Sequence, residues 1–309
     1  VGSVNGESRT YDKTLSLSFH VPEQVKHIAV DASHDNSGTG KLKRLAEIAA
    51  RNSITVRNFE TELPENSDLL LITAPSKPFD EEFVEKVRSF AENGGSLLII
   101  GSGATKLFEK ELGVSITDTV KQKRVFIGDK YDYCSFGELS DINEVKVLTA
   151  VAAENAFLNS DFSDIHTALT VNGLGKGKIA GIYFDIGQQY INGRTAGACD
   201  FVKRTVSKLL QKPGLTVTGS RNVEVALRRN CGKKEVVLLN CSGPHSDPNT
   251  FTYDELLPIC NITVKVKTEN KPEKVVRQPE NLQLDFEWDG EYTAVKLEKL
   301  EIMSVITLD

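Results

Sequence analysis

Residues 68–103 read DLLLITAPSKPFDEEFVEKVRSFAENGGSLLIIGSG. Two apolar runs, at 68–74 and 96–101, enclose a segment in which apolar residues recur at helical spacing. Asp80 is a good N-cap for this helix, and Gly94-Gly95 marks its end. A strand, a helix and a second strand in this order predict a right-handed crossover between two parallel strands.

The same alternation extends in both directions from this unit. A polar, turn-rich leader or linker occupies residues 1–22. We predict that residues 23–213 form an α/β domain with a flavodoxin-like, mainly parallel sheet and flanking helices. Residues 113–178 are less regular, with strand candidates at 124–128 and 146–152. The remaining predicted elements are strands at 27–30, 53–59 and 178–184 and helices at 41–50 and 197–210.

The pattern changes after Pro213-Gly214, where apolar and polar residues begin to alternate in short runs. Such runs are typical of half-buried strands, and Asp289-Gly290 is a tight-turn signal between two of them. We therefore predict that residues 214–309 form a smaller antiparallel all-β sandwich.

Composition excludes several classes of function. The 309 residues carry a net charge of −6, which argues against a nucleic-acid groove. No apolar run approaches the roughly 20 residues that span a bilayer, so we expect no membrane span and a soluble chain, either cytoplasmic or exported. The five cysteines form no CxxC pair and no zinc-type spacing. We expect no metal and no cofactor, and the redox state of the thiols is left open.

The loop DASHDNSGTGKL, residues 31–42, follows the first predicted strand. It is not a phosphate loop, because Asp35 stands where a Walker motif has its first glycine and Leu42 replaces the hydroxyl residue. Its place at the carboxyl end of a strand favours ligand contact, for which Asp31, Asp35 and Asn36 are candidates. The same residue types also cap helices and build turns, and that alternative remains open.

Two further strand ends carry candidate residues. Ser102, in IIGSGATKLF, is placed as a nucleophile would be on a sharp strand-to-helix turn. His34 is the candidate base. Asp185 follows the strand KIAGIYF and is the candidate orienting acid, with Gln188 nearby as a ligand contact. An aspartate at a strand end is also a common turn residue.

Taken together, residues 25–212 resemble the class I glutamine-amidotransferase-like fold, most clearly over the stretch 68–103. The most similar branches are the trimerisation domain of β-galactosidases and the related domain of gliding-motility and intraflagellar-transport proteins. In the true amidotransferases a nucleophilic cysteine stands at the turn that here reads Gly-Ser-Gly-Ala, residues 101–104. Their Phe-His-Pro-Glu stretch corresponds here to Phe184 through Gly187, so the resemblance implies that the ancestral acyl transfer is lost.

The C-terminal segment is similar to the terminal β-domains of glycoside hydrolases. The similarity rests on VEVALRRNCGKKEVVLLNCSG, residues 223–243, and on the strand-rich segment 272–308. In those enzymes an upstream (β/α)₈ barrel carries the two carboxylates that hydrolysis needs. No such barrel fits in this chain.

These observations favour a non-catalytic accessory and assembly region of a carbohydrate-active protein. Its expected partners are carbohydrate, an upstream catalytic domain or further copies in a homo-oligomer. One alternative is a small hydrolase that uses Ser102 with His34. Another is a carbohydrate-binding module in which Trp288 and Tyr292, on either side of the Asp289-Gly290 turn, stack on a sugar ring. Whether the chain is catalytic by itself is left open.

Overall fold

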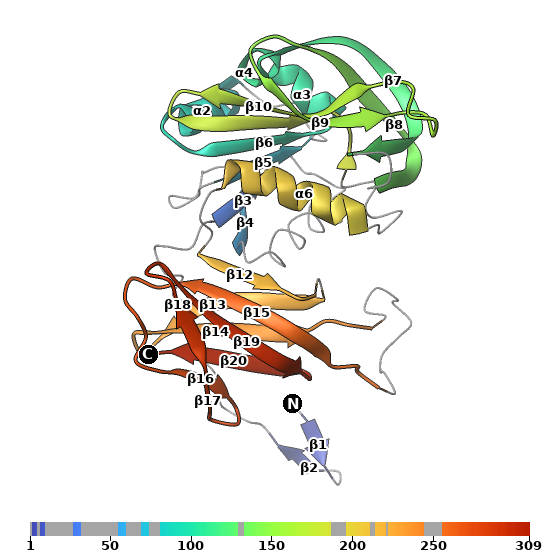
Figure 1. Cartoon of the computed structure of the whole chain (residues 1–309). Coiled ribbons are helices and arrows are strands. Elements are labelled where there is room, and N and C mark those ends of the chain that lie inside the picture. The colour runs from blue at the N-terminus through green and yellow to red at the C-terminus, as the bar shows by residue number, and fades with distance from the viewer. Residues whose placement is uncertain are drawn as a thin grey trace.

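The computed structural model places a sheet with helices against both of its faces in one part of the chain and an antiparallel sandwich in another (Figure 1). The first 73 residues are described only as five short strands, and the rest of the chain is described with a few gaps. The described ranges are 2–4, 7–9, 27–31, 55–59, 69–73, 81–128, 133–186, 196–210, 214–220, 222–243 and 255–309.

The large sheet has nine strands in the order β4-β3-β5-β6-β11-β10-β9-β7-β8. The first five strands in that order are parallel, and each later neighbour pairs antiparallel. The strands are β3 (His27–Asp31), β4 (Thr55–Phe59), β5 (Leu69–Thr73), β6 (Ser96–Ile100), β7 (Val114–Ile127), β8 (Tyr133–Val147), β9 (Val151–Phe157), β10 (His166–Leu174) and β11 (Gly177–Ile182).

The expectation of a flavodoxin-like, mainly parallel sheet with flanking helices was wrong. The chain is mostly β, the large sheet is mixed, and the described residues contain only the helices α2 (Glu81–Glu92), α3 (Ser102–Leu107), α4 (Glu109–Leu112) and α6 (Ala196–Leu209). The difference arises between β6 and β11, where four consecutive strands follow one another. Short connections between them permit only antiparallel pairing, because a parallel return needs a crossover of a dozen or more residues.

The two faces of the sheet support separate apolar clusters. Helix α6 packs through Phe201 and Val206 on one face, against Leu98 and Ile182. Helices α2, α3 and α4 pack on the opposite face, in the cluster that contains Leu97. Strand β6 is buried along its whole length, which is why its sequence, SLLII, does not alternate.

Glycine allows the β10–β11 turn to pack against the end of α2. A Cβ on Gly177 would lie 1.9 Å from the carbonyl oxygen of Gly95 and 2.4 Å from that of Ala91. Beside it, the amide of Lys176 donates to the carbonyl of Glu92 at 3.0 Å and satisfies one of the last helical acceptors. Glycine is therefore needed in this turn because the turn packs closely against the end of α2, which is distant in sequence.

The antiparallel sandwich is confirmed. A four-stranded sheet, β12-β15-β19-β18, and a five-stranded sheet, β13-β14-β20-β16-β17, share one apolar core that includes Val264 and Ile306. Its strands are β12 (Leu215–Thr218), β13 (Val223–Asn230), β14 (Lys233–Asn240), β15 (Ile259–Lys267), β16 (Val275–Gln278), β17 (Leu282–Leu284), β18 (Phe286–Trp288), β19 (Tyr292–Leu300) and β20 (Met303–Leu308).

At the other end of the chain, β1 (Gly2–Val4) and β2 (Glu7–Arg9) form a small antiparallel pair. The helix predicted at 41–50 and the N-cap Asp80 lie outside the described residues.

Candidate functional site

Three of the predicted site residues lie at strand ends on one edge of the large sheet. Ile100 of β6 pairs with Ile182 of β11 in parallel register, so both strands end at the same level. Ser102 follows the first of these ends, and Asp185 follows the second. Asp31 is the last residue of β3, which is separated from β11 by β5 and β6. Strands β3 and β11 are thus roughly 14 Å apart.

The turn between β6 and α3 is fixed by its own backbone. Gly101 has φ 98° and ψ 157°, a conformation that a residue with a Cβ rarely adopts. Its amide donates to the carbonyl of Ile182 at 2.9 Å, which joins the turn to the end of β11. Its carbonyl accepts from the Thr105 hydroxyl at 2.8 Å. Ser102 therefore begins the helix in a defined position.

Asn143, a residue of β8, fastens the long β7–β8 hairpin to this turn. Its Nδ2 donates to the carbonyl of Ser102 at 2.7 Å and to the Thr105 hydroxyl at 2.9 Å. Its Oδ1 accepts from the Thr119 hydroxyl at 2.9 Å. The side chain is 2% exposed. We did not predict this residue, because nothing in the local sequence indicates which turn a strand 41 residues away will contact.

Tyr183 lies beneath the turn, in the cluster that contains Ala104 and Phe108. It is fully buried, and its hydroxyl is hydrogen-bonded to the hydroxyl of Thr170 at 2.5 Å. Burial raises the pKa of the Tyr183 hydroxyl to about 12, although the contact with Thr170 acts in the opposite direction. This phenol therefore stays protonated at neutral pH, and its hydroxyl links the end of β11 to β10.

The catalytic role of Ser102 stays a prediction, because the structure describes the serine without the base that was predicted for it. Within the part of the chain that the structure describes, no imidazole or carboxylate is hydrogen-bonded to its hydroxyl. A serine needs such a base to lose its proton in acyl transfer. The predicted base His34 and the predicted ligand contacts Asp35, Asn36 and Gln188 lie outside the described residues, so their roles stay predictions.

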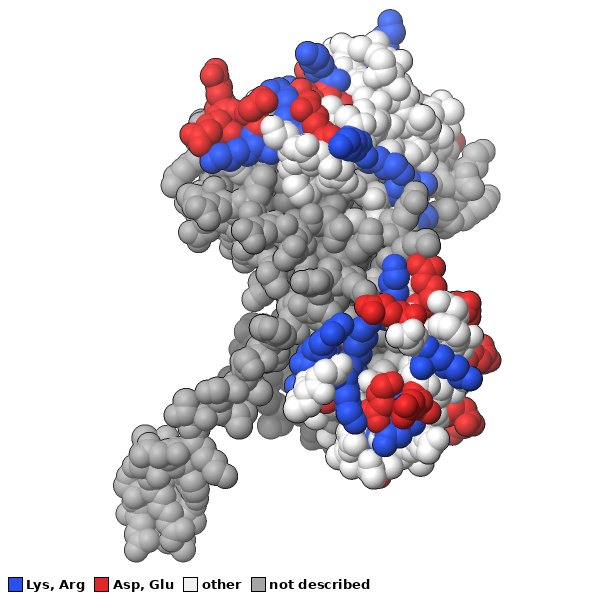
Figure 2. Space-filling model, turned by 90° about the vertical axis from the view of Figure 1, so that its left-hand side faces the viewer, with Lys and Arg blue, Asp and Glu red and all other residues white. Residues whose placement is uncertain are grey.

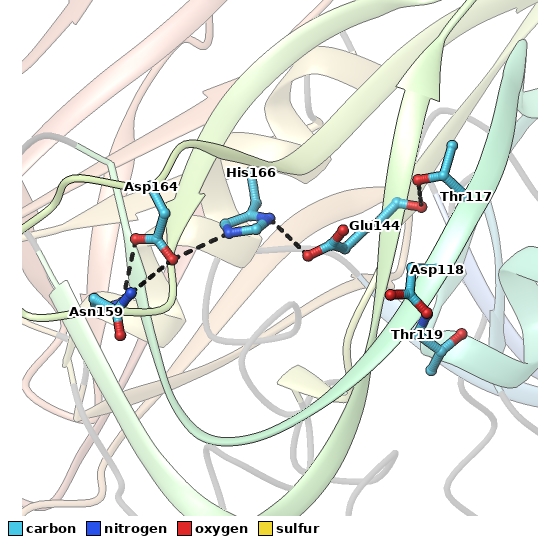
Figure 3. A network of polar contacts seen from close by, with 7 residues as sticks. All are labelled: Thr117, Asp118, Thr119, Glu144, Asn159, Asp164 and His166. Atoms are coloured by element: carbon cyan, nitrogen blue, oxygen red, sulfur yellow. Dashed lines mark hydrogen bonds and ion pairs between the residues drawn. The ribbon is translucent and has the colours of Figure 1, made fainter.

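A second polar cluster surrounds His166, at the start of β10 (Figure 3). Its Nδ1 lies 3.4 Å from Oε1 of Glu144 in β8, and its Nε2 lies 3.2 Å from Oδ2 of Asp164. Asn159 donates from Nδ2 to the same Asp164 oxygen at 3.1 Å. The carbonyl of Glu144 accepts from the Thr117 hydroxyl at 3.2 Å. The imidazole is thus held between two carboxylates.

This His166 cluster holds the parts of an acid–base pair. An imidazole oriented by a carboxylate can move a proton, but no serine or cysteine side chain contacts it among the described residues. We did not predict the cluster. Asp164 lies in the bend just before β10, so its contact with His166 depends on the path of that bend, which the local sequence does not indicate. Glu144 carries no local signal either, since it reaches His166 only through the folding of β8 onto the start of β10.

The sandwich places Trp288 at the edge of a sheet. Trp288 is 37% exposed. Its cross-strand partner, Thr293, is fully buried. Tyr292 is the neighbour of Thr293 on β19 and so points to the opposite face of the sheet. The two aromatic rings therefore do not form one stacking platform. A separate groove of about 680 Å³ opens beside β17, β18 and β19, and its walls include Asn261, Lys296 and Glu298.

Several solved structures have an architecture similar to that of this chain. An α-L-fucosidase isoenzyme from Paenibacillus thiaminolyticus superposes with a TM-score of 0.73 at 14% sequence identity, over 93% of this chain and 49% of the fucosidase. The chain shares its fold with parts of glycoside hydrolases. A catalytic mutant of a GH42 β-galactosidase from G. stearothermophilus gives a TM-score of 0.57 at 16% identity, over 92% of this chain and 40% of that one. A β-galactosidase from Bacillus circulans sp. alkalophilus gives 0.55 at 11% identity, over 92% and 41%.

The chain therefore spans about half the length of the fucosidase and about two fifths of the β-galactosidases. At these identities the likeness concerns the fold alone. No protein-family model matches the sequence, and no curated protein matches it.

Other kinds of site find no support in the described residues. They contain no cluster of three or more histidine, cysteine, aspartate or glutamate side chains that could hold a metal ion. No described helix is long and apolar enough to cross a membrane. On the face seen in Figure 2, acidic and basic side chains are interspersed over the described surface. No disulfide joins the described cysteines Cys231, Cys241 and Cys260.

Proposed function

We propose that this chain is a non-catalytic accessory and assembly region of a glycoside-hydrolase-like protein. The observation that carries the proposal is the asymmetry of coverage, since the fold match extends over 93% of this chain but only 49% of the fucosidase. The rest of the fucosidase chain lies outside the match to this chain. Carbohydrate, a catalytic domain and further copies of the chain are the partners that this role implies.

The turn at Ser102 supports the non-catalytic part of the proposal. We propose that it descends from the nucleophile turn of the class I glutamine-amidotransferase-like fold, with serine in place of cysteine. Asp185 and Gly187 would stand where those enzymes have histidine and glutamate. Acyl transfer needs a nucleophile, a base and a group that orients the base. Asn143 instead engages the carbonyl of Ser102, which is a structural use of the same turn.

We also propose the division into a linker at 1–22, a region with the large mixed sheet at 23–213 and a sandwich at 214–309. The apolar clusters support it, because Leu215 through Leu308 contribute all members of the sandwich cluster. The two clusters of the large sheet are made by residues between Phe83 and Leu210.

An assay of the purified chain tests the function. We expect no turnover above background with a panel of nitrophenyl glycosides and nitrophenyl esters, and no difference between the wild type and Ser102→Ala. The rival hydrolase predicts turnover in the wild type that falls by orders of magnitude in Ser102→Ala. That result would replace the accessory role with a serine hydrolase.

The intact mass of the native polypeptide, measured by mass spectrometry from its source, tests the accessory role itself. A mass well above 34.0 kDa supports a catalytic domain in the same polypeptide. A mass near 34.0 kDa, with no catalytic chain recovered as a partner, would contradict the proposal.

A further inference from the structure

The groove beside β17, β18 and β19 lies where the chain passes from one sheet of the sandwich to the other. Strand β17 is the edge of the five-stranded sheet and β18 is the edge of the four-stranded sheet, and only Asp285 separates them. Strand β18 pairs with β19 only from Thr293 to Val295. Beyond Val295, β15 is the one described strand that pairs with β19. The resulting opening of about 680 Å³ has the size of a small-ligand site, which is about 300–1,000 Å³.

Part of the groove wall is apolar. Leu282 of β17 is 53% exposed, and Leu284 and Phe286 are half-buried, packed against the sandwich core. The three residues alternate with polar ones along the passage from β17 to β18. They offer the C–H groups of a ligand a surface from which water can be displaced, which favours binding of apolar area.

The polar residues of the groove are exposed, and they have hydrogen-bonding groups to spare. Among the residues that the structure describes, no hydrogen bond or ion pair is made by the side chains of Asn261, Asp285, Glu287, Lys296 and Glu298, all of which line the groove. Two amide or ammonium donors and three carboxylate acceptors are therefore available to a ligand.

Charged residues of the same strands that lie outside the groove are paired instead. Lys265 of β15 lies 3.8 Å from Asp289, and Lys299 of β19 lies 2.6 Å from Glu301. Within the groove, Arg277 is also engaged, since its Nε lies 3.4 Å from Oε2 of Glu280 and donates to the Ser304 hydroxyl at 3.1 Å. The unpaired side chains thus gather in the one hollow of this edge.

The charges of the groove indicate which ligands it suits. The carboxylates of Asp285, Glu287 and Glu298 outnumber the ammonium of Lys296, which is the one unpaired cation among the groove residues, so an anionic ligand would be repelled. The carboxylates do not converge as metal ligands do, because the described residues contain no cluster of three such groups that could hold an ion. Dispersed acceptors beside an apolar strip suit a neutral ligand with many hydroxyl groups.

We propose that this groove binds a neutral oligosaccharide. The sugar hydroxyls donate to Asp285, Glu287 and Glu298, in hydrogen bonds that the negative charge of the acceptor strengthens, and Lys296 donates to a sugar oxygen. The C–H side of a ring lies against Leu282. This inference rests on the proposed function, in which carbohydrate is a partner, and assigns the binding to a surface other than Trp288 and Tyr292.

Isothermal titration calorimetry on the whole chain tests the proposal, with the linear tetrasaccharides of galactose, glucose and mannose as probes. We expect at least one of them to bind with a Kd below about 1 mM. The counterpart of that sugar built from uronic acids, which adds a carboxylate to each ring, should bind at least about tenfold more weakly because the groove is negative.

Single substitutions then locate the binding. Glu287→Gln and Glu298→Gln should each weaken it by about tenfold, because a neutral amide replaces a charged acceptor. Glu273→Gln is the matched control, since Glu273 is equally exposed and does not line the groove. Circular dichroism and thermal unfolding confirm that each variant is folded.

Two results would overturn the proposal. One is that none of the three tetrasaccharides binds at concentrations up to about 10 mM. The other is that binding occurs but is no more sensitive to Glu287→Gln and Glu298→Gln than to Glu273→Gln. The intact mass of the native polypeptide and the glycoside and ester assay report separately on the proposed function, so the two can fail independently.

Discussion

At the scale of single residues, Asn143 shows how one buried amide can join three elements. It contacts the turn at Ser102, the helix residue Thr105 and the neighbouring strand at Thr119, and Asn143 itself is 2% exposed. Buried polar groups are costly when left without a partner. The turn, the helix and the long hairpin therefore depend on the same side chain.

Asn143→Ala should lower the free energy of unfolding by about 1–3 kcal/mol, because it leaves the carbonyl of Ser102 and the hydroxyls of Thr105 and Thr119 without this partner. Urea denaturation measures the change. The control is Asn93→Ala at the exposed end of α2, where the lost hydrogen bond to Ser89 faces water and the change should stay below about 0.5 kcal/mol. Equal effects of the two substitutions would contradict this account of Asn143.

Tyr183 predicts a specific dependence on alkaline pH. Its pKa is raised to about 12 in the folded protein, above the value of about 10 for an unfolded tyrosine. The stabilisation is thus fully present below pH 10 and is lost as the pH rises through about 12, with an upper limit of about 2–3 kcal/mol. Unfolding measured between pH 8 and pH 11 should show this loss. Tyr183→Phe should be less stable at pH 8, yet lose less stability on going to pH 11; parallel curves would refute the prediction.

At the scale of elements, the β10–β11 turn is shaped by its contact with α2. Gly177→Ala should destabilise the fold by about 1–3 kcal/mol or more, because the new Cβ meets two carbonyl oxygens that cannot both move. Gly173→Ala, on the strand just before this turn, is the matched control, since a Cβ there meets nothing within 4 Å. Thermal unfolding of the two variants should differ clearly, and similar melting temperatures would argue against close packing of this turn.

The elements differ in how well the sequence predicts them. Strand β6, helix α2, helix α6 and most sandwich strands carry strong local patterns, and each was expected close to its observed place. The region between β6 and β11 was not. There the residues of β7 mix exposed, half-buried and buried positions without regular alternation, so period-two patterning is weak. The mixed sheet follows from pairing across long distances, which no local pattern encodes.

At the scale of the whole molecule, the sandwich carries a core of its own. All members of its apolar cluster come from Leu215 through Leu308, so residues 214–309 expressed alone should fold cooperatively. A single sigmoidal denaturation curve and dispersed amide resonances would support this. The same fragment with Val264→Asp, which places a carboxylate at a fully buried position, is the unfolded control. A wild-type fragment that resembles this control would show that the sandwich needs the rest of the chain.

Only those residues of the candidate site that directly follow a parallel strand could be predicted from the sequence. Ser102 and Asp185 were found because parallel strands end at a common edge, and that much needs no side-chain information. Asn143 and Glu144 act on residues some distance away in sequence, through a hairpin whose path depends on the whole sheet.

The pairing of β6 with β11 also affects how the chain is made on the ribosome. The partner of this wholly buried strand is synthesised about 80 residues later, which at 5–20 residues per second is a delay of roughly 4–16 s. During that interval one edge of SLLII is without its final neighbour, while β7 to β10 can already form local hairpins. Nascent chains should therefore depend on chaperones most strongly after Ile100 emerges and before Ile182 does.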